Sequence, residues 1–456
     1  MARKRIIPMA LFTLLLGWSP WLGARETTPD FSPLPQESQL PTAMHSAMDT
    51  LPRITVGPED ADLIGSDNRV LQAAVDYVAA LGGGLVEIRA GEYLMHDSLH
   101  LRSNVTIRGD KGKTVLRKAD SVVSALALDG DFGEEQITVE DREGFAVGYG
   151  VAVWDDRAGG FHTTVARITG QSGPTFSIDK PLMADCMVSH HAQAATVFPV
   201  VSAYDAEGLR IEDLAVEGNK AGNVHLNGCR GAGIFLYRAH GAVVQRCTVR
   251  GYNGDGISFQ QSNDVLVSDC ISEDNASLGI HPGSGSQRPA VRRCTARKNG
   301  TDGLYLCWRV RHGLFEDNTL AENGQFGISI GHKDSDNLLR RNVVRLNQQH
   351  GIFFRHESLG MAPHRNRLVD NLIENNGGAE IRIRGTVNGL VFRDNVIRDR
   401  RAEEAGARNV GIQIDETVGP VILESNTIET SVLVDDRRPP ERSGASSVAL
   451  PGSVEN

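Results

Sequence analysis

The chain has 456 residues, of which 23% are charged, and its formal net charge at pH 7 is −10. This composition excludes a chain that is disordered throughout, and the negative balance gives no support to nucleic-acid binding, which normally leaves a basic footprint. Glycine is abundant, with 49 residues, as a fold of many short strands and tight corners requires. All-β folds of this length can form one domain.

The N-terminus has the pattern of a secretory signal. A basic segment at residues 3–5 precedes an apolar stretch from 6 to about 18, and Gly23-Ala24 offers a small-residue cleavage site. The apolar run is shorter than the ~20 residues of a spanning helix. We therefore expect a cleaved signal over 1–24, no membrane span, and a protein that is secreted or periplasmic.

The chain after the signal divides into a linker, one β domain and a tail. Residues 25–52 carry scattered Pro, Ser and Thr without apolar periodicity, which predicts a linker. Residues 53–432 are expected to form the domain, with an irregular or inserted β-rich segment at 130–199, where the repeat described below is lost. The charged, Pro- and Ser-rich residues 433–456 are predicted to be disordered.

A helix is predicted at the start of the domain. Apolar residues recur at helical spacing between Asn68 and Leu81, and three glycines follow at 82–84. Such a helix could cover the open end of a stack of strands, which would otherwise be an exposed edge. Short strands are then predicted at Leu85–Ile88, Ser98–Leu101 and Val105–Ile107.

A repeat of about 24 residues governs the rest of the domain. One position of the repeat recurs at spacings of 23 to 31 residues, as Cys247, Cys270, Cys294, Asn318, Asn342, Asn371, Asn395 and Asn426. A second asparagine and a glycine follow in each unit, and the glycine begins a short alternating strand such as Gly327-Ile328-Ser329-Ile330. This period without a helical pattern is typical of a parallel β-helix, in which equivalent residues of successive coils stack. We interpret the Cys/Asn column as a structural ladder, with thiols or a disulfide between adjacent coils.

With its N-terminal helix, glycine-rich strand entry and Asn-x-x-(Asp)-Gly-Ile coils, the chain resembles the pectate-lyase-like superfamily of right-handed β-helix proteins over roughly residues 55–430. The resemblance implies an all-β, right-handed parallel β-helix with a capping helix. It implies a carbohydrate-active function less specifically, because the superfamily includes lyases, hydrolases, esterases, epimerases and adhesins.

Chemistry-bearing residues gather in the outward columns that follow the repeat glycines. A solvent face without function would carry Thr, Ser, Asn, Lys and Glu in no order, whereas this one concentrates aromatic, histidine and cationic residues with small residues between them. Such a ribbon suits an acidic polysaccharide. We predict substrate-binding roles for Gln260, Trp308, Arg309, His356, Arg382 and Arg384.

Two reactions compete for these residues. Elimination or epimerisation at a uronate needs a base, a cation that stabilises the enolate, and an acid. We predict Lys333 or His332 as the base, Arg355 as the cation and Tyr305 as the acid, with His281 as a further candidate.

Glycoside hydrolysis needs two carboxylates instead, and the candidates are Asp255, Asp302, Asp334 and Glu357. Asn253-Gly254-Asp255-Gly256 and the Gly-Ile-Ser-Ile-Gly at 327–331 look like polygalacturonase motifs, but the paired aspartates and the histidine of that family are missing. A non-catalytic glycan-binding protein or adhesin is the alternative from another class.

Asp334, Asp336 and Glu357 are also candidate ligands of Ca²⁺, which the lyases of the superfamily often use near the substrate carboxylate. Cys307 lies beside Trp308 on the same ribbon. Because nothing in the sequence activates its thiol, we do not predict a nucleophile there.

Overall fold

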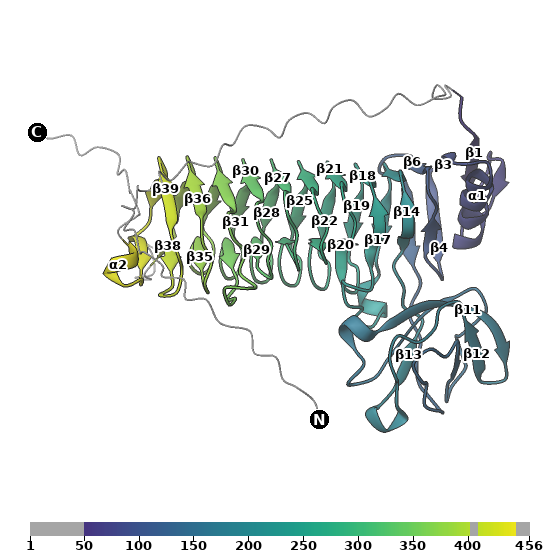
Figure 1. Cartoon of the computed structure of the whole chain (residues 1–456). Coiled ribbons are helices and arrows are strands. Elements are labelled where there is room, and N and C mark those ends of the chain that lie inside the picture. Colours follow the sequence, from purple (N-terminus) through teal and green to yellow (C-terminus); the bar gives the residue numbers. More distant parts are fainter. Residues whose placement is uncertain (1–49, 402–408, 444–456) are drawn as a thin grey trace, which may run out of the picture. The chain divides into compact units, whose positions relative to one another are not determined.

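The computed structural model describes residues 50–401 and 409–443, and most of them lie in a parallel β-helix (Figure 1). Three sheets run along its axis, and each coil contributes one short strand to each sheet. The predicted signal and all but the last residues of the predicted linker lie outside the described residues. No helix of the described part is long and apolar enough to cross a membrane.

The three sheets are parallel, and their strands are stacked in the following orders. Sheet A has 13 strands: β2 (Leu63–Ile64), β1 (Arg53–Gly57), β3 (Gly84–Ile88), β6 (Val105–Gly109), β15 (Arg210–Glu212), β18 (Val243–Gln245), β21 (Leu266–Ser268), β24 (Ala290–Arg292), β27 (Leu314–Glu316), β30 (Leu338–Arg340), β33 (Arg367–Val369), β36 (Leu390–Arg393) and β39 (Val421–Glu424). Sheet B has 11 strands: β4 (Gly91–Met95), β7 (Thr114–Lys118), β16 (Ala215–Glu217), β19 (Thr248–Arg250), β22 (Ile271–Glu273), β25 (Thr295–Arg297), β28 (Thr319–Ala321), β31 (Val343–Arg345), β34 (Leu372–Glu374), β37 (Val396–Arg398) and β40 (Thr427–Glu429). Sheet C has 11 strands: β5 (Leu99–Leu101), β14 (Val201–Glu207), β17 (Ala232–His240), β20 (Asp255–Gln260), β23 (Ile280–Gly283), β26 (Leu304–Tyr305), β29 (Ile328–Ile330), β32 (Ile352–Phe354), β35 (Ile381–Ile383), β38 (Val410–Ile414) and β41 (Val432–Asp436).

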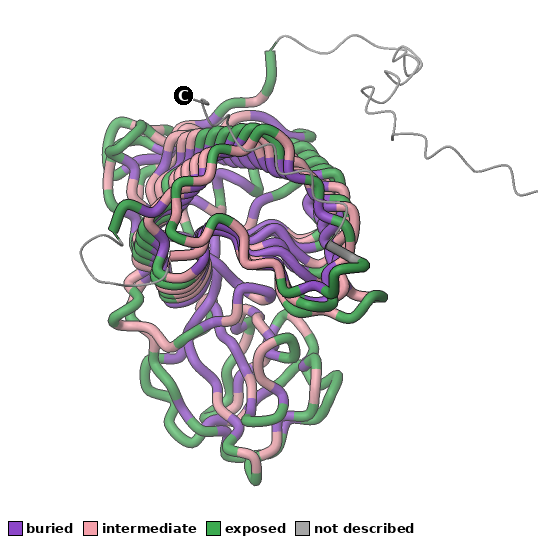
Figure 2. The backbone as a smooth tube through the Cα atoms, turned by 90° about the vertical axis from the view of Figure 1, so that its left-hand side faces the viewer, coloured by how far each residue is buried: buried purple, intermediate pink, exposed green. Residues whose placement is uncertain are grey.

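The interior of the helix is filled by aliphatic and aromatic ladders. In sheet A, Val291 pairs with Phe315, Phe315 with Leu339, and Leu339 with Leu368, and each of these four side chains is at most 1% exposed. Figure 2 views the described chain along the stack and shows buried residues lining the inside of the coils while exposed residues lie outside. Burial of each such side chain stabilises the fold by about 1.5–3 kcal/mol.

The Asn column is a hydrogen-bonded ladder, as predicted. The backbone N–H and the side-chain amide of Asn318 both donate to Oδ1 of Asn342, at 3.1 and 3.0 Å, and Asn342 donates in the same way to Asn371. The spare amide proton of Asn342 reaches the carbonyl of Phe315 at 2.9 Å. These bonds satisfy the backbone at corners where the strands of sheets A and B meet.

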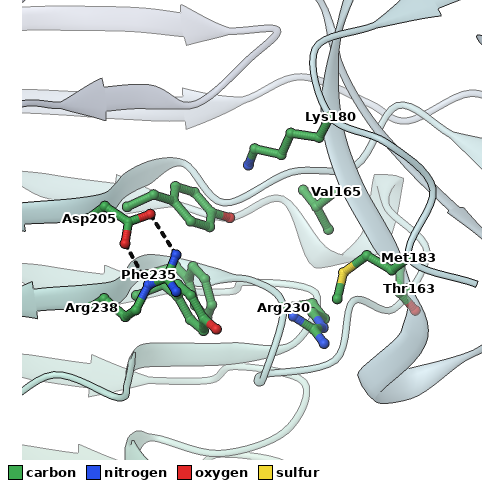
Figure 3. Close-up of a pocket in the computed structure, with 10 residues that line it drawn as sticks. Thr163, Val165, Lys180, Met183, Asp205, Arg230, Phe235 and Arg238 are labelled. Atoms are coloured by element: carbon green, nitrogen blue, oxygen red, sulfur yellow. Dashed lines mark hydrogen bonds and ion pairs between the residues drawn. The ribbon is translucent and has the colours of Figure 1, made fainter. Parts of the chain in front are cut away.

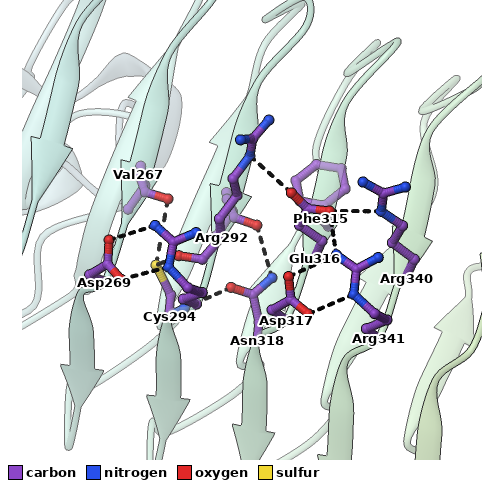
Figure 4. A network of polar contacts seen from close by, with 12 residues as sticks. Val267, Asp269, Arg292, Cys294, Phe315, Glu316, Asp317, Asn318, Arg340 and Arg341 are labelled. Atoms are coloured by element: carbon purple, nitrogen blue, oxygen red, sulfur yellow. Dashed lines mark hydrogen bonds and ion pairs between the residues drawn. The ribbon is translucent and has the colours of Figure 1, made fainter.

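Cysteine replaces asparagine in the earlier coils of the same column. All six cysteines are free thiols, so no disulfide joins adjacent coils. Cys294 donates from its thiol to the carbonyl of Val267 at 3.6 Å, and its N–H donates to Oδ1 of Asn318 at 2.9 Å (Figure 4). Outside the ladder, charged side chains pair across coils, for example Arg341 with Asp317.

Helix α1 (Asn68–Ala80) begins the domain and confirms the predicted capping helix. Its N-cap Asp67 accepts from the N–H groups of Arg69 and Val70, which satisfies two of the free donors of the first turn. Leu71, Ala74, Val75 and Val78 are fully buried against the first coils. The helix covers the end of the apolar interior.

The segment without the repeat is an inserted antiparallel sheet. Its six strands are ordered β8 (Val123–Ala125), β13 (Gln193–Ala195), β10 (Gly150–Trp154), β11 (Thr164–Ser172), β12 (Thr175–Ile178) and β9 (Gln136–Thr138). The insertion also contains two short 3-10 helices, η1 (Gly160–His162) and η2 (Val188–His190). A third 3-10 helix, η3 (Lys220–Gly222), lies outside the insertion and follows β16. A separate apolar cluster that includes Val151, Ile168 and Phe176 forms its core. The insertion starts before residue 130, the boundary predicted from the sequence, because β8 already pairs with β13.

The C-terminal boundary also differs from the prediction. Residues 433–436 were expected in the disordered tail, but β41 pairs in parallel with β38 and extends sheet C through Asp436. A short helix, α2 (Pro440–Ser443), follows. The prediction missed this last coil because the segment is rich in charged residues. Its strand nevertheless alternates, with Asp435 at an outward position and Val432 and Val434 at inward positions.

Asn342→Ala should destabilise the protein by about 2–5 kcal/mol, because it leaves the donors of Asn318 and the carbonyl of Phe315 without partners inside the fold. The measurement is the denaturant midpoint of unfolding. Arg345→Ala, at the exposed end of the strand that follows Asn342, is the control. Equal midpoints for the two variants would contradict a stabilising ladder.

Candidate functional site

The outward columns predicted from the repeat are confirmed by the strand register of sheet C. Ser258 pairs with His281, Tyr305 with Ser329, and Phe353 with Arg382, so these residues lie in one row across successive coils. Gly283 and Cys307 pair in the row two residues further along. The register therefore brings together residues that are 23 to 29 positions apart in sequence.

Glycines on both sides of Cys307 leave space for long neighbouring side chains. A Cβ at Gly283 would lie 2.4 Å from the amide oxygen of Gln260, and a Cβ at Gly331 would lie 2.4 Å from Nε of Arg355. The Gln260 and Arg355 side chains consequently fold over these glycines. Cys307 lies between them, 4% exposed.

Cys307 lines an open cavity of about 320 Å³ beside sheet C. One wall comes from the inserted sheet through Phe161, and another from the loop that carries Cys229. The polar residues of the lining are His225, Asn227, Asp255, Ser277, His281, Thr301, Asp302, Tyr305 and Gln325. The cavity thus combines two thiols, two carboxyl groups, a phenol and histidine.

Asp255 and His281 form a buried pair in this cavity. Nδ1 of His281 donates to Oδ2 of Asp255 at 2.7 Å, and both side chains are at most 4% exposed. Burial disfavours the charged imidazole, but hydrogen bonds with Asp255 and Cys307 outweigh it and raise the pKa of His281 to about 9. His281 is therefore a cation at neutral pH.

Arg355 links the next two coils. Its guanidinium donates to Oγ of Ser329 at 2.8 Å and to the carbonyl of Leu306 at 2.6 Å, and it lies 3.3 Å from Asp334. The same guanidinium lies 4.3 Å from the ring centre of Tyr305. The rings of Tyr305 and His281 pack edge to face, with their centres 5.3 Å apart. These contacts hold Tyr305 in place, and burial raises the pKa of its phenol, so that it stays protonated.

His332, Glu357 and Trp308 form the rim beyond Arg355. Nε2 of His332 lies 3.0 Å from the carboxylate of Glu357, and the indole of Trp308 packs on the imidazole at 5.4 Å between ring centres. Trp308 is 39% exposed. The guanidinium of Arg309 lies 5.8 Å from the indole. This rim is a half-open aromatic and cationic surface that suits a sugar ring.

The other residues predicted to bind substrate lie away from the cavity that Cys307 lines. Gln260 is buried and donates to Oγ of Ser258 at 2.9 Å, so it is not part of an exposed binding surface, and it does not line the cavity. Arg382 and Arg384 both pair with Asp415 and lie three coils away from Cys307. Lys333 is half-buried and His356 exposed, and neither lines the cavity.

Each of the three predicted calcium ligands has another partner in the structure. Asp334 is fully buried and accepts from the N–H groups of Val310 and Gly331, Asp336 pairs with Arg365, and Glu357 pairs with His332. Among the described residues no cluster of three or more His, Cys, Asp or Glu is arranged to hold a metal ion. Calcium binding by this trio stays a prediction without a preformed ligand set.

Sequence reasoning set aside or overlooked the residues around Cys307. The thiol contacts His281 and His332, although nothing in the sequence predicted its activation. Asp255 was considered only as a candidate carboxylate for hydrolysis, and Cys229 was not singled out. The signal that could have found Cys307 is its place between Gly283 and Gly331 in one column.

A second pocket of about 270 Å³ extends the site toward the N-terminus (Figure 3). The inserted sheet contributes Val165, and Lys180 follows its strand β12; Tyr204 and Tyr237 come from sheet C. Nζ of Lys180 lies 3.7 Å from the ring centre of Tyr204. Arg230 lines this pocket and donates to the carbonyl of Phe161, which lines the neighbouring cavity.

Comparisons with known proteins agree with this architecture. A family model described as "Right handed beta helix region" matches residues 214–362. The A-module of mannuronan C-5 epimerase AlgE4 from Azotobacter vinelandii superposes with a TM-score of 0.58 at 17% identity, over 87% of this chain and 100% of that one. This chain has a right-handed parallel β-helix fold.

Two further solved structures have similar β-helices. A polygalacturonase from Erwinia carotovora gives a TM-score of 0.55 at 11% identity, over 86% of this chain and 97% of that one. The Dettilon tailspike protein gives 0.55 at 13% identity, over 86% and 68%. At these identities the likeness shows the fold alone. A search of curated protein sequences found no match.

Asp302→Asn should change how stability depends on pH. Burial raises the pKa of Asp302 to about 7, above the ~3.9 of an unfolded aspartate. The contribution of this carboxyl to stability is therefore complete below about pH 4 and is lost as pH rises through about 7. Asparagine does not ionise, so the variant does not lose stability in this way. Its unfolding midpoint should therefore rise relative to that of the wild type as the pH increases from 4 to 8.

Denaturant unfolding across that pH range measures the effect, with Asp370→Asn at an exposed position as the control. A difference between Asp302→Asn and wild type that stays constant with pH would show that the carboxyl titrates normally.

Proposed function

We propose that this protein is an exported enzyme that removes the proton beside the carboxylate of a uronate in an acidic polysaccharide, by epimerisation or elimination. The observation that carries the proposal is the group of acid–base residues at the cavity beside sheet C. His281, Tyr305 and Cys307 line this cavity together. The N-terminal signal pattern supports export.

The charges in the site fit a uronate better than a neutral sugar. His281 is a buried cation, and the carboxylate of Asp255 accepts a hydrogen bond from its Nδ1. A carboxylate that enters the cavity, which His281 lines, would lie close to this positive charge. Such a contact would stabilise the enolate that forms when the neighbouring proton leaves.

This assignment revises the roles expected from the sequence. Arg355 was expected to neutralise the substrate carboxylate, but its guanidinium is occupied by Ser329, Leu306 and Asp334. We therefore assign the cation's role to His281 and a positioning role to Arg355, which holds Tyr305. Tyr305 keeps the role of the acid that protonates the leaving oxygen or the opposite face of the ring.

The contacts of the carboxylates argue against hydrolysis. A glycosidase needs two carboxyl groups that reach one glycosidic bond. Asp255 is engaged by His281, Asp334 is fully buried, and Glu357 pairs with His332. Asp302 alone remains as a cavity carboxyl with a pKa near neutrality.

The similar structures support a carbohydrate-active protein. One is named as an epimerase of mannuronan, a uronate polymer, and another as a polygalacturonase. The pocket at Lys180 and Tyr204 and the rim at Trp308 lie on either side of the cavity along sheet C. Aromatic and cationic groups spread in this way over several coils suit a chain of acidic sugars.

The first experiment is incubation of the mature protein with uronate polymers, sulfated glycans and neutral glycans, in deuterated buffer. Elimination should give ultraviolet absorbance from unsaturated ends together with new reducing ends. Epimerisation should give deuterium on the carbon next to the carboxylate, without chain cleavage. Reducing ends alone would mean hydrolysis and contradict the proposal. No turnover on any polymer, with retention on one, would instead favour a glycan-binding protein.

Tyr305→Phe should lower kcat by about 10²-fold or more while KM changes little, because it removes the proton donor and keeps the ring on Arg355. Tyr77→Phe, exposed on helix α1, is the matched control and should keep full activity. If Tyr305→Phe retained wild-type kcat on the active polymer, the phenol could not be the acid.

A further inference from the structure

We propose that Cys307 is the base of this site: its thiolate takes the proton from the carbon next to the uronate carboxylate. This inference rests on the proposed function and deepens it by naming the group that starts the reaction. No such role follows from the sequence, where Cys307 is one of six cysteines.

The first support is a chain of three residues on successive coils. Asp255 accepts from Nδ1 of His281 at 2.7 Å, and His281 in turn interacts with Cys307, which lies on the next coil and lines the same cavity. A reactive group whose partner histidine is oriented by a carboxylate is the arrangement by which proteins activate serine and cysteine side chains. Here the carboxylate fixes the ring and favours its charged form, which in turn favours the thiolate.

The second support is the location of the thiol. Cys307 lines the cavity together with Tyr305 and Cys229, whereas Lys333, one of the two bases expected from the sequence, does not. His332, the other, pairs with Glu357 at the rim. Of these groups, only the thiol lies inside the cavity beside both the cation and the acid that the reaction needs.

The third support is the state of the ionisable groups that surround the thiol. Burial alone would raise the pKa of Cys307, but hydrogen bonds from His281 and His332 and the charge of Arg355 lower it to about 6. Tyr305, Asp334 and Cys229 also interact with the thiol, and burial raises the pKa of each of them. At neutral pH Cys307 is therefore ionised beside a cationic His281 and a protonated Tyr305.

The fourth support is the packing on either side of the thiol. Gln260 is 1% exposed and folds over Gly283, and Arg355 folds over Gly331, the two glycines that flank Cys307. Cys307 is 4% exposed between them, so solvent screens its interaction with the imidazolium only weakly.

The step balances without any further reactant. The C–H bond beside the carboxylate breaks, its electron pair moves into the carboxyl group as an enolate, and the proton forms an S–H bond on Cys307. The enolate then either returns its electrons to carbon and takes a proton on the opposite face, or expels the oxygen at the β-position, which leaves with a proton from the acid. The thiol finally loses its proton to water.

Alkylation by iodoacetamide tests the ionisation of Cys307 without substrate. Mass spectrometry of the intact fold, sampled at several pH values, gives the rate at each cysteine. The rate at Cys307 should rise with a midpoint near pH 6, and Cys229 provides an internal control because it lines the same cavity while burial raises its pKa. A midpoint at Cys307 near the ~8.5 of a free thiol would overturn the proposal.

Asp255→Asn tests whether the contact chain is responsible. The amide keeps the shape of the side chain but not its charge, so the alkylation midpoint at Cys307 should move upward by one pH unit or more, and the acidic limb of kcat/KM should move with it. Asp264→Asn, on the surface, should leave both unchanged. A purely structural role for Asp255 would move neither midpoint, and that result would contradict the contact chain.

Cys307→Ser tests the chemistry, because serine keeps the size of the side chain but does not ionise near neutral pH. We expect kcat to fall by about 10²-fold or more, with retention on the same polymer unchanged. Turnover within about threefold of wild type would overturn the inference and leave the proposed function intact. A wild-type protein inactive on every uronate polymer would instead overturn the proposed function itself, and the assignment of Cys307 with it.

Discussion

The in-register stacking of parallel strands is the constraint on which the rest of this structure depends. Adjacent strands of a sheet lie about 4.8 Å apart, so a residue's nearest side-chain neighbours are the equivalent residues of the coils on either side. Inside the helix this produces the Val291–Phe315–Leu339 ladder, and at the corners the asparagine ladder. Outside, the same geometry places single residues from many coils in one straight row.

A row of this kind can concentrate groups that would be difficult to bury together by other means. Asp255, His281 and Cys307 lie on three different coils, and each reaches the next one. The net charge of a carboxylate, an imidazolium and a thiolate is small enough to tolerate burial, because each charge has a partner of opposite sign. Arg355 and Asp334 form a second such pair one coil further along.

The inserted sheet gives the row its depth. A β-helix face is shallow by itself, since its strands are short and its side chains stand side by side. The insertion contributes Phe161, Val165 and Lys180 to pockets that sheet C alone would leave open. It packs around its own apolar core, so its loops can vary without disturbing the coils.

The sequence by itself determined the fold, the capping helix and the outward columns, because a repeat of fixed length dictates which residues stack. It also identified His281, Tyr305, Arg355, His332 and Trp308 as members of one ribbon. Only the tertiary structure decided their roles, because these depend on contacts between coils. Arg355 is engaged by three neighbours, Asp334 is buried, and Cys307 lies against two histidines. A column read from sequence gives the order of the side chains but neither their rotamers nor the wall that the insertion adds, and those two features set the charge of each group and its access to a substrate.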